Sequence, residues 1–254
     1  MSDAPHFRRF LEASKLDNLT AEAFVHRANR WVVADMSSLS IFDQSSPEFD
    51  LPPVDDQLQQ LFATRRSRRV FNDDPLPIDA VASALAAAGA FEGRSVIPSA
   101  GGFDPLGIYA LVRRSEGKLD GSVVRYLPGE HRVARLGPVP DDDRCRRLFG
   151  LDCEGMPSLL VVIAVDPAAT LRRYGERGGR FLVQQVGHAM QNIGLRLAQT
   201  QQTSRRRPAG FGRRTPVVPL HGYLTGGLLD EVTTVLGIDH TGAVPLGAYA
   251  VGRA

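Results

Sequence analysis

The sequence predicts a globular protein in which helices and strands are mixed along the chain, and three features carry this prediction. Residues 159–165 form a continuous apolar run with several β-branched residues, which is typical of a strand buried on both faces. Residues 180–201 repeat apolar residues at helical spacing and predict the longest helix. Residues 108–113 and 123–127 predict two shorter strands, which a glycine-containing hairpin turn joins.

The composition bounds the class of protein. With 254 residues the chain has room for one large domain or two small ones, and 43% hydrophobic and 23% charged residues are ordinary for a soluble globular protein. No apolar run reaches the ~20 residues of a membrane helix, and residues 1–5 carry no signal pattern, so we expect a cytoplasmic protein without a membrane partner. The formal net charge of +2 is too small for a general nucleic-acid-binding role.

Cys145 and Cys153 are the two cysteines of the chain. Their spacing does not fit a CxxC metal site, and two cysteines are too few for a disulfide scaffold. A bridge between them is possible, but a reducing compartment favours two free thiols. The sequence therefore predicts no metal site.

The sequence predicts two regions: an N-terminal arm and linker at residues 1–60, and a main domain at residues 61–254. Scattered apolar residues in the arm are compatible with short helices. Residues 45–53 are rich in serine and proline, which is typical of a linker. Residues 55–62 predict one short helix just before the core of the main domain.

The core begins with the arginine-rich segment 65–71, which we interpret as an extended chain entering a turn. Alternate residues of an extended chain point the same way, so Arg65, Ser67 and Arg69 are expected on one face. Two guanidinium groups that flank a hydroxyl predict a cradle for a phosphate monoester, because guanidinium binds phosphate bidentately. The alternative interpretation is a solvated run of arginines.

Helix and turn signals divide the rest of the domain. The helix predicted at 78–90 has Asp79 in its first turn, where a negative charge is favourable. Small residues at 94–102 allow a ligand to approach the backbone closely. The remaining patterns predict a turn at 128–131, a short strand at 133–136, a polar helix at 141–149, a helix at 228–236 that ends at Gly237, and a last strand at 248–253.

The predicted long helix has one apolar face and several small residues. Gly187 and Gly194 leave room for close packing of another helix, and His188 is interpreted as a hydrogen-bonded core or interface residue rather than a catalyst. The helix is followed by a long arginine-rich loop within residues 199–219. The apolar stripe consists of Leu182, Val186, Ala189, Met190, Ile193 and Leu197.

Several separated segments match one family in sequence order. They are Arg65–Arg69 with Pro75–Leu76, Pro98–Gly102 with Tyr109, Val124–Tyr126 with His131, Arg173–Phe181, Gly187–His188 with Gln191–Asn192, and Gly222–Tyr223. On these segments the chain resembles the flavin-dependent nitroreductase superfamily. Within it, the chain resembles most the SagB-type dehydrogenases, which oxidise azolines to azoles during the maturation of peptide natural products. The resemblance covers residues 60–254 and is loose before them.

The resemblance implies an α+β, nitroreductase-like fold with a central, mostly antiparallel sheet flanked by helices. It also implies an intertwined homodimer that binds FMN at its interface. Arg65, Ser67 and Arg69 match phosphate-binding positions of the family, and Arg253 is a further candidate for contact with the phosphate.

The resemblance also implies which residues surround the flavin ring. Pro98, Ser99 and Ala100 match a segment that approaches the flavin, commonly from the partner subunit. His221 and Gly222 match positions whose backbone N–H groups face the isoalloxazine. Together with the phosphate-binding positions, these residues form the implied cofactor site.

Azoline oxidases of this type often carry a Lys-Tyr pair before the long helix, and Arg173–Tyr174 stands at that position here. Arginine effectively does not lose its proton, so Arg173 cannot replace the lysine as a base. We expect Tyr174 to be the acid–base group and Arg173 its electrostatic partner. The alternative is that Tyr174 only packs under the long helix. A second departure is the arginine-rich loop, residues 203–216, which could border the mouth of the active site.

The function implied by the resemblance is oxidation of a peptide thiazoline or oxazoline to the azole, with a cyclodehydratase or synthetase as a possible partner. Three other functions stay open. The first is an NAD(P)H-dependent nitro- or quinone reductase, and the second is a non-catalytic peptide-docking subunit of an azole-forming synthetase complex. The third is a nucleic-acid-binding module built on residues 205–214. The missing lysine of the Lys-Tyr pair keeps the second of these open.

Overall fold

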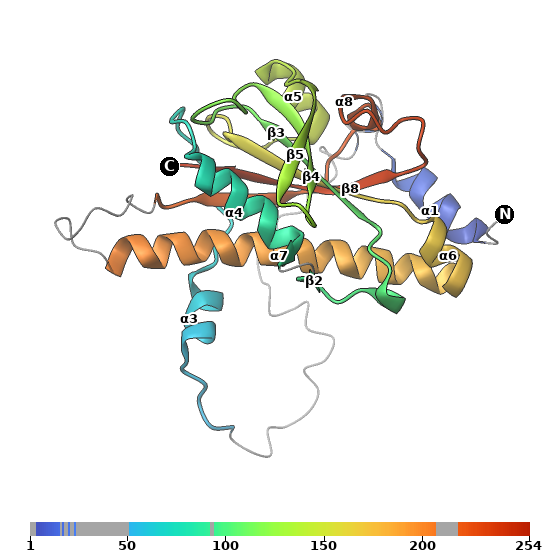
Figure 1. Ribbon diagram of the computed structural model, residues 1–254, viewed down its shortest axis with the longest axis horizontal. Coiled ribbons are helices and arrows are strands. Elements are labelled where there is room, and N and C mark those ends of the chain that lie inside the picture. Colours follow the sequence, from blue (N-terminus) through green and yellow to red (C-terminus); the bar gives the residue numbers. More distant parts are fainter. Residues whose placement is uncertain are drawn as a thin grey trace.

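The computed structural model describes residues 4–15, 17, 20, 23, 51–91, 94–206 and 218–254. Most of the predicted linker 45–53 and of the loop 203–216 lies outside these described residues. A sheet rests on one long helix, α7, and helices α5 and α8 lie on the other side of the sheet (Figure 1). The helices are α1 (Pro5–Ser14), α3 (Gln57–Thr64), α4 (Ile78–Ala88), α5 (Asp142–Phe149), α6 (Ala168–Tyr174), α7 (Glu176–Arg206) and α8 (Val232–Val235), with one 3-10 turn, η2 (Ala100–Gly102).

The central sheet has six strands in the order β5-β4-β3-β6-β8-β7, and every neighbouring pair is antiparallel. This arrangement confirms the expected antiparallel sheet flanked by helices. The strand predicted at 159–165 lies in the middle of the sheet. The strands are β3 (Leu106–Val112), β4 (Ser122–Leu127), β5 (Arg132–Pro138), β6 (Leu159–Val165), β7 (His221–Thr225) and β8 (Val244–Gly252), and a separate short hairpin consists of β1 (Ala90–Phe91) and β2 (Arg94–Ser95).

The central strand β6 joins two hydrophobic clusters, one on each face of the sheet. Leu159 and Val161 point into the cluster shared with α4 and α7, and Leu160 and Val162 point into the cluster shared with α5 and α8. All seven residues of β6 are buried. Each fully buried aliphatic side chain contributes about 1.5–3 kcal/mol. The prediction of a strand buried on both faces is therefore confirmed.

Helix α7 begins at Glu176, earlier than the predicted residue 180, and its first turn contains two glycines. Glycine disfavours helix interiors, which is why Gly178 and Gly179 indicate a later start when only the sequence is considered. A Cβ atom at Gly178 would lie 2.9 Å from the carbonyl oxygen of Thr170, and one at Gly179 would lie 2.2 Å from the ring of Phe7. The glycines thus allow α6 and α1 to pack closely on α7, and this packing outweighs the low helix propensity.

Helix α1 is attached to α7 through its N-terminal backbone. The N–H groups of His6 and Phe7 donate to the two carboxylate oxygens of Glu176, at 2.7 Å each. A carboxylate satisfies the free N–H groups at a helix start and interacts favourably with the helix dipole. Phe7 and Leu11 are buried. The first helix of the predicted arm therefore packs on the main domain, beside α6.

Two further elements differ from the predictions. No strand is predicted at β7, whose five residues include a glycine and follow a loop rich in proline and arginine. The helix predicted at 228–236 contracts to α8, with irregular chain before it. Both lie near the edge of the sheet, where packing against β8 rather than sequence periodicity decides the local structure.

The two cysteines are free thiols, as predicted. Cys145 is buried, and this burial raises the pKa of its thiol to about 11. Cys153 is partly exposed. Among the described helices, none combines the length and the apolar character that crossing a membrane requires.

Candidate active site

The arginine-rich segment 65–71 runs beside the edge of the sheet formed by β7. The N–H of Arg68 donates to the carbonyl oxygen of Gly222 at 3.1 Å. The N–H of Asn72 donates to the carbonyl oxygen of Arg253, just after β8, at 2.9 Å. The structure thus brings together the backbones of three predicted cofactor-binding elements: the arginine segment, the start of β7 and the C-terminal arginine.

The side chains of Arg65 and Arg69 lie at different faces of the sheet. The guanidinium carbon of Arg69 is 5.0 Å from the centroid of the Tyr223 ring, which is a cation–π distance. Arg65 lies near Tyr249, which belongs to the opposite hydrophobic cluster. Burial raises the pKa of the Tyr249 hydroxyl, and the charge of Arg65 opposes that rise. Ser67 is exposed, and the two guanidinium groups do not share the expected face.

The other residues predicted at this edge have local roles in the sheet. A Cβ atom at Gly222 would lie 2.1 Å from the carbonyl oxygen of Ala250, so the contact between β7 and β8 by itself requires a glycine. His221 is half-buried at the start of β7. The guanidinium of Arg253 lies 3.4 Å from a carboxylate oxygen of Asp74, and both side chains are partly exposed.

A second group of predicted residues meets at the start of α7. Gly101 follows the predicted flavin-facing segment 98–100 directly and has a φ of +70°, a conformation that favours glycine. A Cβ atom at Gly101 would lie 2.6 Å from the hydroxyl oxygen of Tyr174 and 3.1 Å from a guanidinium nitrogen of Arg173. The structure therefore places Gly101, the residue after the segment 98–100, directly against the predicted catalytic pair.

Tyr174 and Arg173 lie among aromatic rings at the end of α6. The guanidinium carbon of Arg173 is 5.3 Å from the centroid of the Tyr174 ring and 5.6 Å from that of Phe103. The ring of Tyr174 meets the ring of Phe181 edge to face, with centroids 5.2 Å apart. Tyr174 is half-buried and Arg173 is exposed. The ring of Tyr174 thus packs on the first turns of α7, as the alternative interpretation expects, while its hydroxyl points to the loop at Gly101.

Phe103 and Asp104, which follow the run of small residues at 94–102, have no prediction from the sequence. Gly101 and Phe103 contact Arg173, and burial raises the pKa of the Asp104 carboxyl next in the chain. The hydroxyl of Ser99 is buried and has no hydrogen-bond partner among the described residues. A buried hydroxyl without a partner is uncommon and indicates a place where a ligand group or water binds.

The two groups of residues are far apart along α7. Arg65 packs against α7 at Gly194. A Cβ atom added to Gly194 would lie 3.4 Å from the Cδ atom of Arg65. Tyr174 lies just before Glu176, the first residue of α7. A helix rises 1.5 Å per residue, so these two positions on α7 are about 27 Å apart. A single copy of the chain therefore does not bring the phosphate-binding candidates and Tyr174 to one point.

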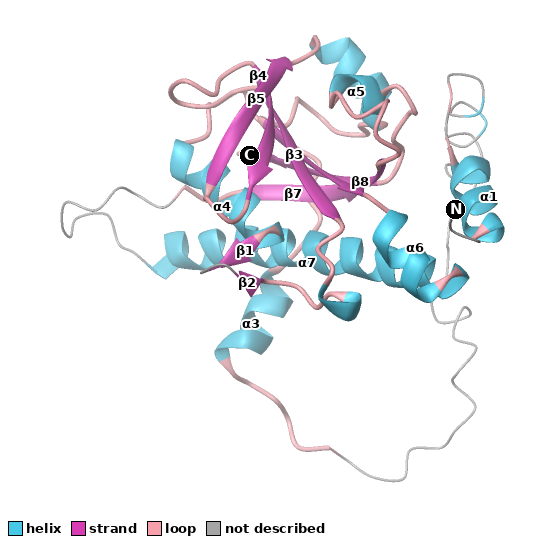
Figure 2. Ribbon diagram, turned by 45° about the vertical axis from the view of Figure 1, so that its right-hand side comes forward, coloured by secondary structure: helices cyan, strands magenta, loops and turns pink. Residues whose placement is uncertain are grey.

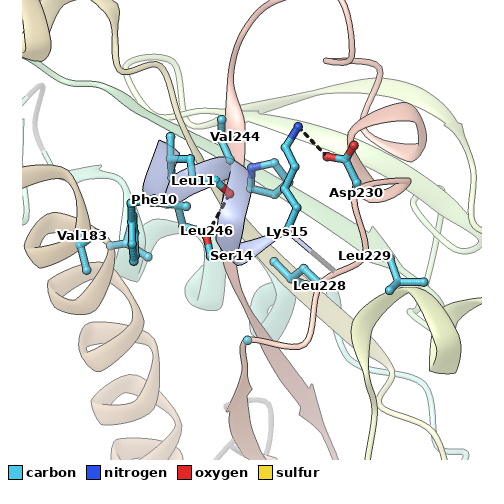
Figure 3. Close-up of a pocket in the computed structure, with 13 residues that line it drawn as sticks. Phe10, Leu11, Ser14, Lys15, Val183, Leu228, Leu229, Asp230, Val244 and Leu246 are labelled. Carbon is cyan, nitrogen blue, oxygen red and sulfur yellow. Dashed lines mark hydrogen bonds and ion pairs between the residues drawn. The ribbon is translucent and has the colours of Figure 1, made fainter. Parts of the chain in front are cut away.

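A separate cavity of about 270 Å³ lies beneath α1. Figure 3 shows it between α1, α7 and the start of β8, with the ion pair of Lys15 and Asp230, 3.5 Å apart, on one side. It contains none of the predicted site residues. Its apolar lining includes Phe10, Leu11, Val183, Leu228, Val244 and Leu246.

Comparison with known proteins places the chain in a family. The model of the nitroreductase family matches residues 62–201. Protein MJ1384 of Methanocaldococcus jannaschii, which is named as a nitroreductase, is 31% identical over 156 residues, and the match covers 58% of this chain and 77% of that protein.

Solved structures share the fold. A chain of the E. coli microcin synthetase McbBCD complex with truncated pro-MccB17 bound aligns with a TM-score of 0.63 and 19% identity, over 95% of this chain and 96% of that chain. A protein of Ralstonia eutropha JMP134 described as a nitroreductase aligns with a TM-score of 0.59 and 20% identity, over 80% of this chain and 88% of that chain. At these identities the similarity is one of fold.

Proposed function

The chain belongs to the nitroreductase family, and from this premise we propose that it is an FMN-dependent dehydrogenase of the SagB type, which oxidises a peptide thiazoline or oxazoline to the azole. The observation that carries the proposal is the contact of Tyr174 and Arg173 with Gly101, which directly follows the predicted flavin-facing segment 98–100. The fold shared with a chain of a microcin synthetase complex that has truncated pro-MccB17 bound supports a peptide substrate and a synthetase partner.

The residues present fit FMN at both ends of the cofactor. Arg65 and Arg69 supply two guanidinium groups that lie at different faces of the sheet edge, so we expect both to reach one phosphate by turning toward the exposed hydroxyl of Ser67. Arg253 lies at the same sheet edge and could add a third positive charge. At the other group of residues, the unpartnered hydroxyl of Ser99 offers a hydrogen bond to a polar edge.

In this proposal bound FMN would supply the hydride acceptor for the oxidation, and the protein supplies binding, orientation and a base. Tyr174 takes the proton that leaves the former α-carbon of the substrate. An unperturbed tyrosine has a pKa of ~10, so its anion needs support near neutral pH. The guanidinium of Arg173, next to the Tyr174 ring, supplies a positive charge that stabilises the phenolate or a substrate anion.

The separation of the two groups of residues along α7 is the reason to infer a homodimer. The position on α7 that Arg65 contacts and the start of α7 beside Tyr174 are about 27 Å apart in one copy, so we infer that one cofactor contacts the two groups from different copies. Helix α3 supports this inference, because none of its residues is buried and it projects from the body of the molecule (Figure 1). An eight-residue helix of this kind gains stability from packing against a partner.

The dimer can be tested at α3. Leu58 and Phe62 are 53% and 42% exposed, so the double variant Leu58→Glu, Phe62→Glu should convert the dimer into a monomer and release FMN. Leu136→Glu is the matched control, because Leu136 is 44% exposed on the opposite edge strand β5. Sedimentation velocity measures the oligomeric state of the double variant and of the control, and the control should stay a dimer. A wild-type monomer that holds FMN tightly would contradict the shared site.

Anaerobic flavin absorbance separates the proposal from the alternatives. The azoline peptide should bleach the flavin band of the FMN-loaded protein, and NAD(P)H should not do so at a comparable rate. Rapid bleaching by NAD(P)H alone would indicate a nitro- or quinone reductase. Protein that stays colourless after FMN is added would indicate a docking subunit, and steeply salt-dependent binding to polynucleotides would indicate the nucleic-acid module.

A further inference from the structure

Helix α7 carries a buried glutamine whose side-chain amide has no hydrogen-bond partner in the part of the chain that the structure describes. Gln185 is only 3% exposed. Neither its amide oxygen nor its amide nitrogen has a hydrogen-bond partner among the residues that the structure describes. Burying an unpaired amide is costly, so an orphan of this kind in a folded protein requires an explanation.

A second buried glutamine on the same helix shows the ordinary situation. Gln201 is 7% exposed, and its amide nitrogen donates to the carbonyl oxygen of Leu220 at 2.7 Å. This bond fixes the chain just before β7 to the helix. Gln201 therefore has a structural role that the packing explains, whereas the amide of Gln185 contributes no such bond.

Gln185 lies on the face of α7 that the segment 96–101 follows. Phe181, one turn earlier, packs on Tyr174, and Asn192, two turns later, donates to the carbonyl oxygen of Val96 at 3.3 Å. The segment thus contacts Asn192 of α7 at its first residue, Val96, and contacts Tyr174 at its last residue, Gly101. Figures 1 and 2 both show the chain between β2 and β3 passing along this part of α7.

The same segment contains the second orphan, the hydroxyl of Ser99. Hydroxyl and amide thus belong to two elements that pass each other beside the catalytic pair. An amide presents one acceptor and two donors in a plane. Its complement is a planar ring edge in which an N–H group and a carbonyl oxygen stand next to each other, as in the pyrimidine ring of a flavin.

We propose that Gln185, together with Ser99, binds the pyrimidine edge of the flavin, with the amide oxygen accepting from the ring N–H and the amide nitrogen donating to a ring carbonyl. This assignment rests on the proposed function. It gives both orphan groups a ligand and makes Gln185 a cofactor-binding residue. In the flavin-free protein Gln185 then weakens the fold, because its buried side-chain amide makes no hydrogen bond to the described residues.

The test measures stability and affinity separately. In flavin-free protein, Gln185→Leu should raise the melting temperature by about 2–4 °C, because the unpaired amide is replaced by an apolar group of similar size. FMN titration followed by fluorescence should show a Kd raised roughly 10–100-fold, which is the loss of two hydrogen bonds. Gln185→Met, which has a different shape but also lacks the amide, should behave in the same way.

Gln201→Leu is the control with the opposite signature. It should lower the melting temperature of the flavin-free protein and leave the Kd for FMN near that of the wild type. A lower melting temperature in Gln185→Leu would overturn the assignment, because it would show a structural role. An unchanged Kd for FMN in both Gln185 variants would also overturn it. Failure of the wild type to bind FMN would overturn the proposed function as well.

Discussion

Tyr174→Phe should lower the rate of azoline oxidation by roughly 10²–10⁴, the usual contribution of a positioned acid or base. The change removes one oxygen atom and keeps the ring that packs edge to face on Phe181. Fold, dimer and flavin content should therefore stay as in the wild type. Single-turnover reduction of the bound flavin by the azoline peptide measures the effect. Unchanged turnover would remove Tyr174 from proton transfer and leave His188 or His221 as candidates.

Two glycines next to the pair offer a matched control for this prediction. Gly101 and Gly102 both have a positive φ, +70° and +74°, so alanine is strained to a similar degree at either position. A Cβ atom at Gly101 would collide with the Tyr174 hydroxyl at 2.6 Å, whereas one at Gly102 would meet nothing within 4 Å. Gly101→Ala should therefore lose turnover and Gly102→Ala should keep most of it.

Arg173 completes the test of the catalytic pair. A lysine at this position restores the Lys-Tyr pair of the family and can act as a base if its pKa is lowered in the site. Retained or raised turnover in Arg173→Lys, together with lost turnover in Arg173→Ala, would support a shared role in proton handling. Equal turnover in both variants would reduce Arg173 to a packing residue between two aromatic rings.

The double variant Arg65→Ala, Arg69→Ala should lose FMN during purification. Each charge-assisted hydrogen bond to the phosphate contributes about 1.5–3 kcal/mol, so the Kd for FMN should rise roughly 10²–10⁴-fold. Arg66→Ala is the control, because Arg66 belongs to the same exposed segment and alternates with the two arginines. Equilibrium dialysis measures the Kd for FMN of the wild type, the double variant and Arg66→Ala. Full flavin occupancy in the double variant would show that the phosphate binds elsewhere.

The sequence predicts the core of this fold well where one physical pattern dominates. The apolar run 159–165 corresponds to β6 residue for residue, since a strand enclosed on both faces must be apolar throughout. The apolar stripe of the long helix from Leu182 to Leu197 is buried, because it faces the sheet. The helices predicted at 55–62 and 141–149 also form, and Asp56 and Asp141 each accept a backbone N–H at the beginning of α3 and α5.

Other features depend on contacts that are distant in sequence. The glycine pair at 178–179 indicates a helix break until Thr170 and Phe7 are placed against it. The common face of Arg65 and Arg69 follows from strand alternation, but their segment is not a strand of the sheet. Its backbone forms hydrogen bonds with Gly222 of β7 and with Glu154, and Asn72, directly after the segment, bonds to Arg253, so the chain turns as it crosses the sheet edge.

The candidate site also combines residues that can be predicted with contacts that depend on the folded chain. Arg173–Tyr174 and the segment 98–100 can be predicted only through the family resemblance, which fixes their roles but not their contact. Their meeting at Gly101 follows from the path of the chain along α7. The orphan amide of Gln185 has no sequence signal, because a glutamine beside an apolar stripe looks like an ordinary surface residue until its burial is measured.

The central claim is that this chain dehydrogenates an azoline, and mass spectrometry of the product tests it most directly. FMN-loaded protein is incubated with a peptide that contains one thiazoline, in the presence of dioxygen. The account predicts a product lighter than the substrate by two hydrogen atoms, formed by the wild type and strongly reduced in Tyr174→Phe. An unchanged peptide mass, with thiazoline and oxazoline substrates alike and with flavin bound, would contradict it.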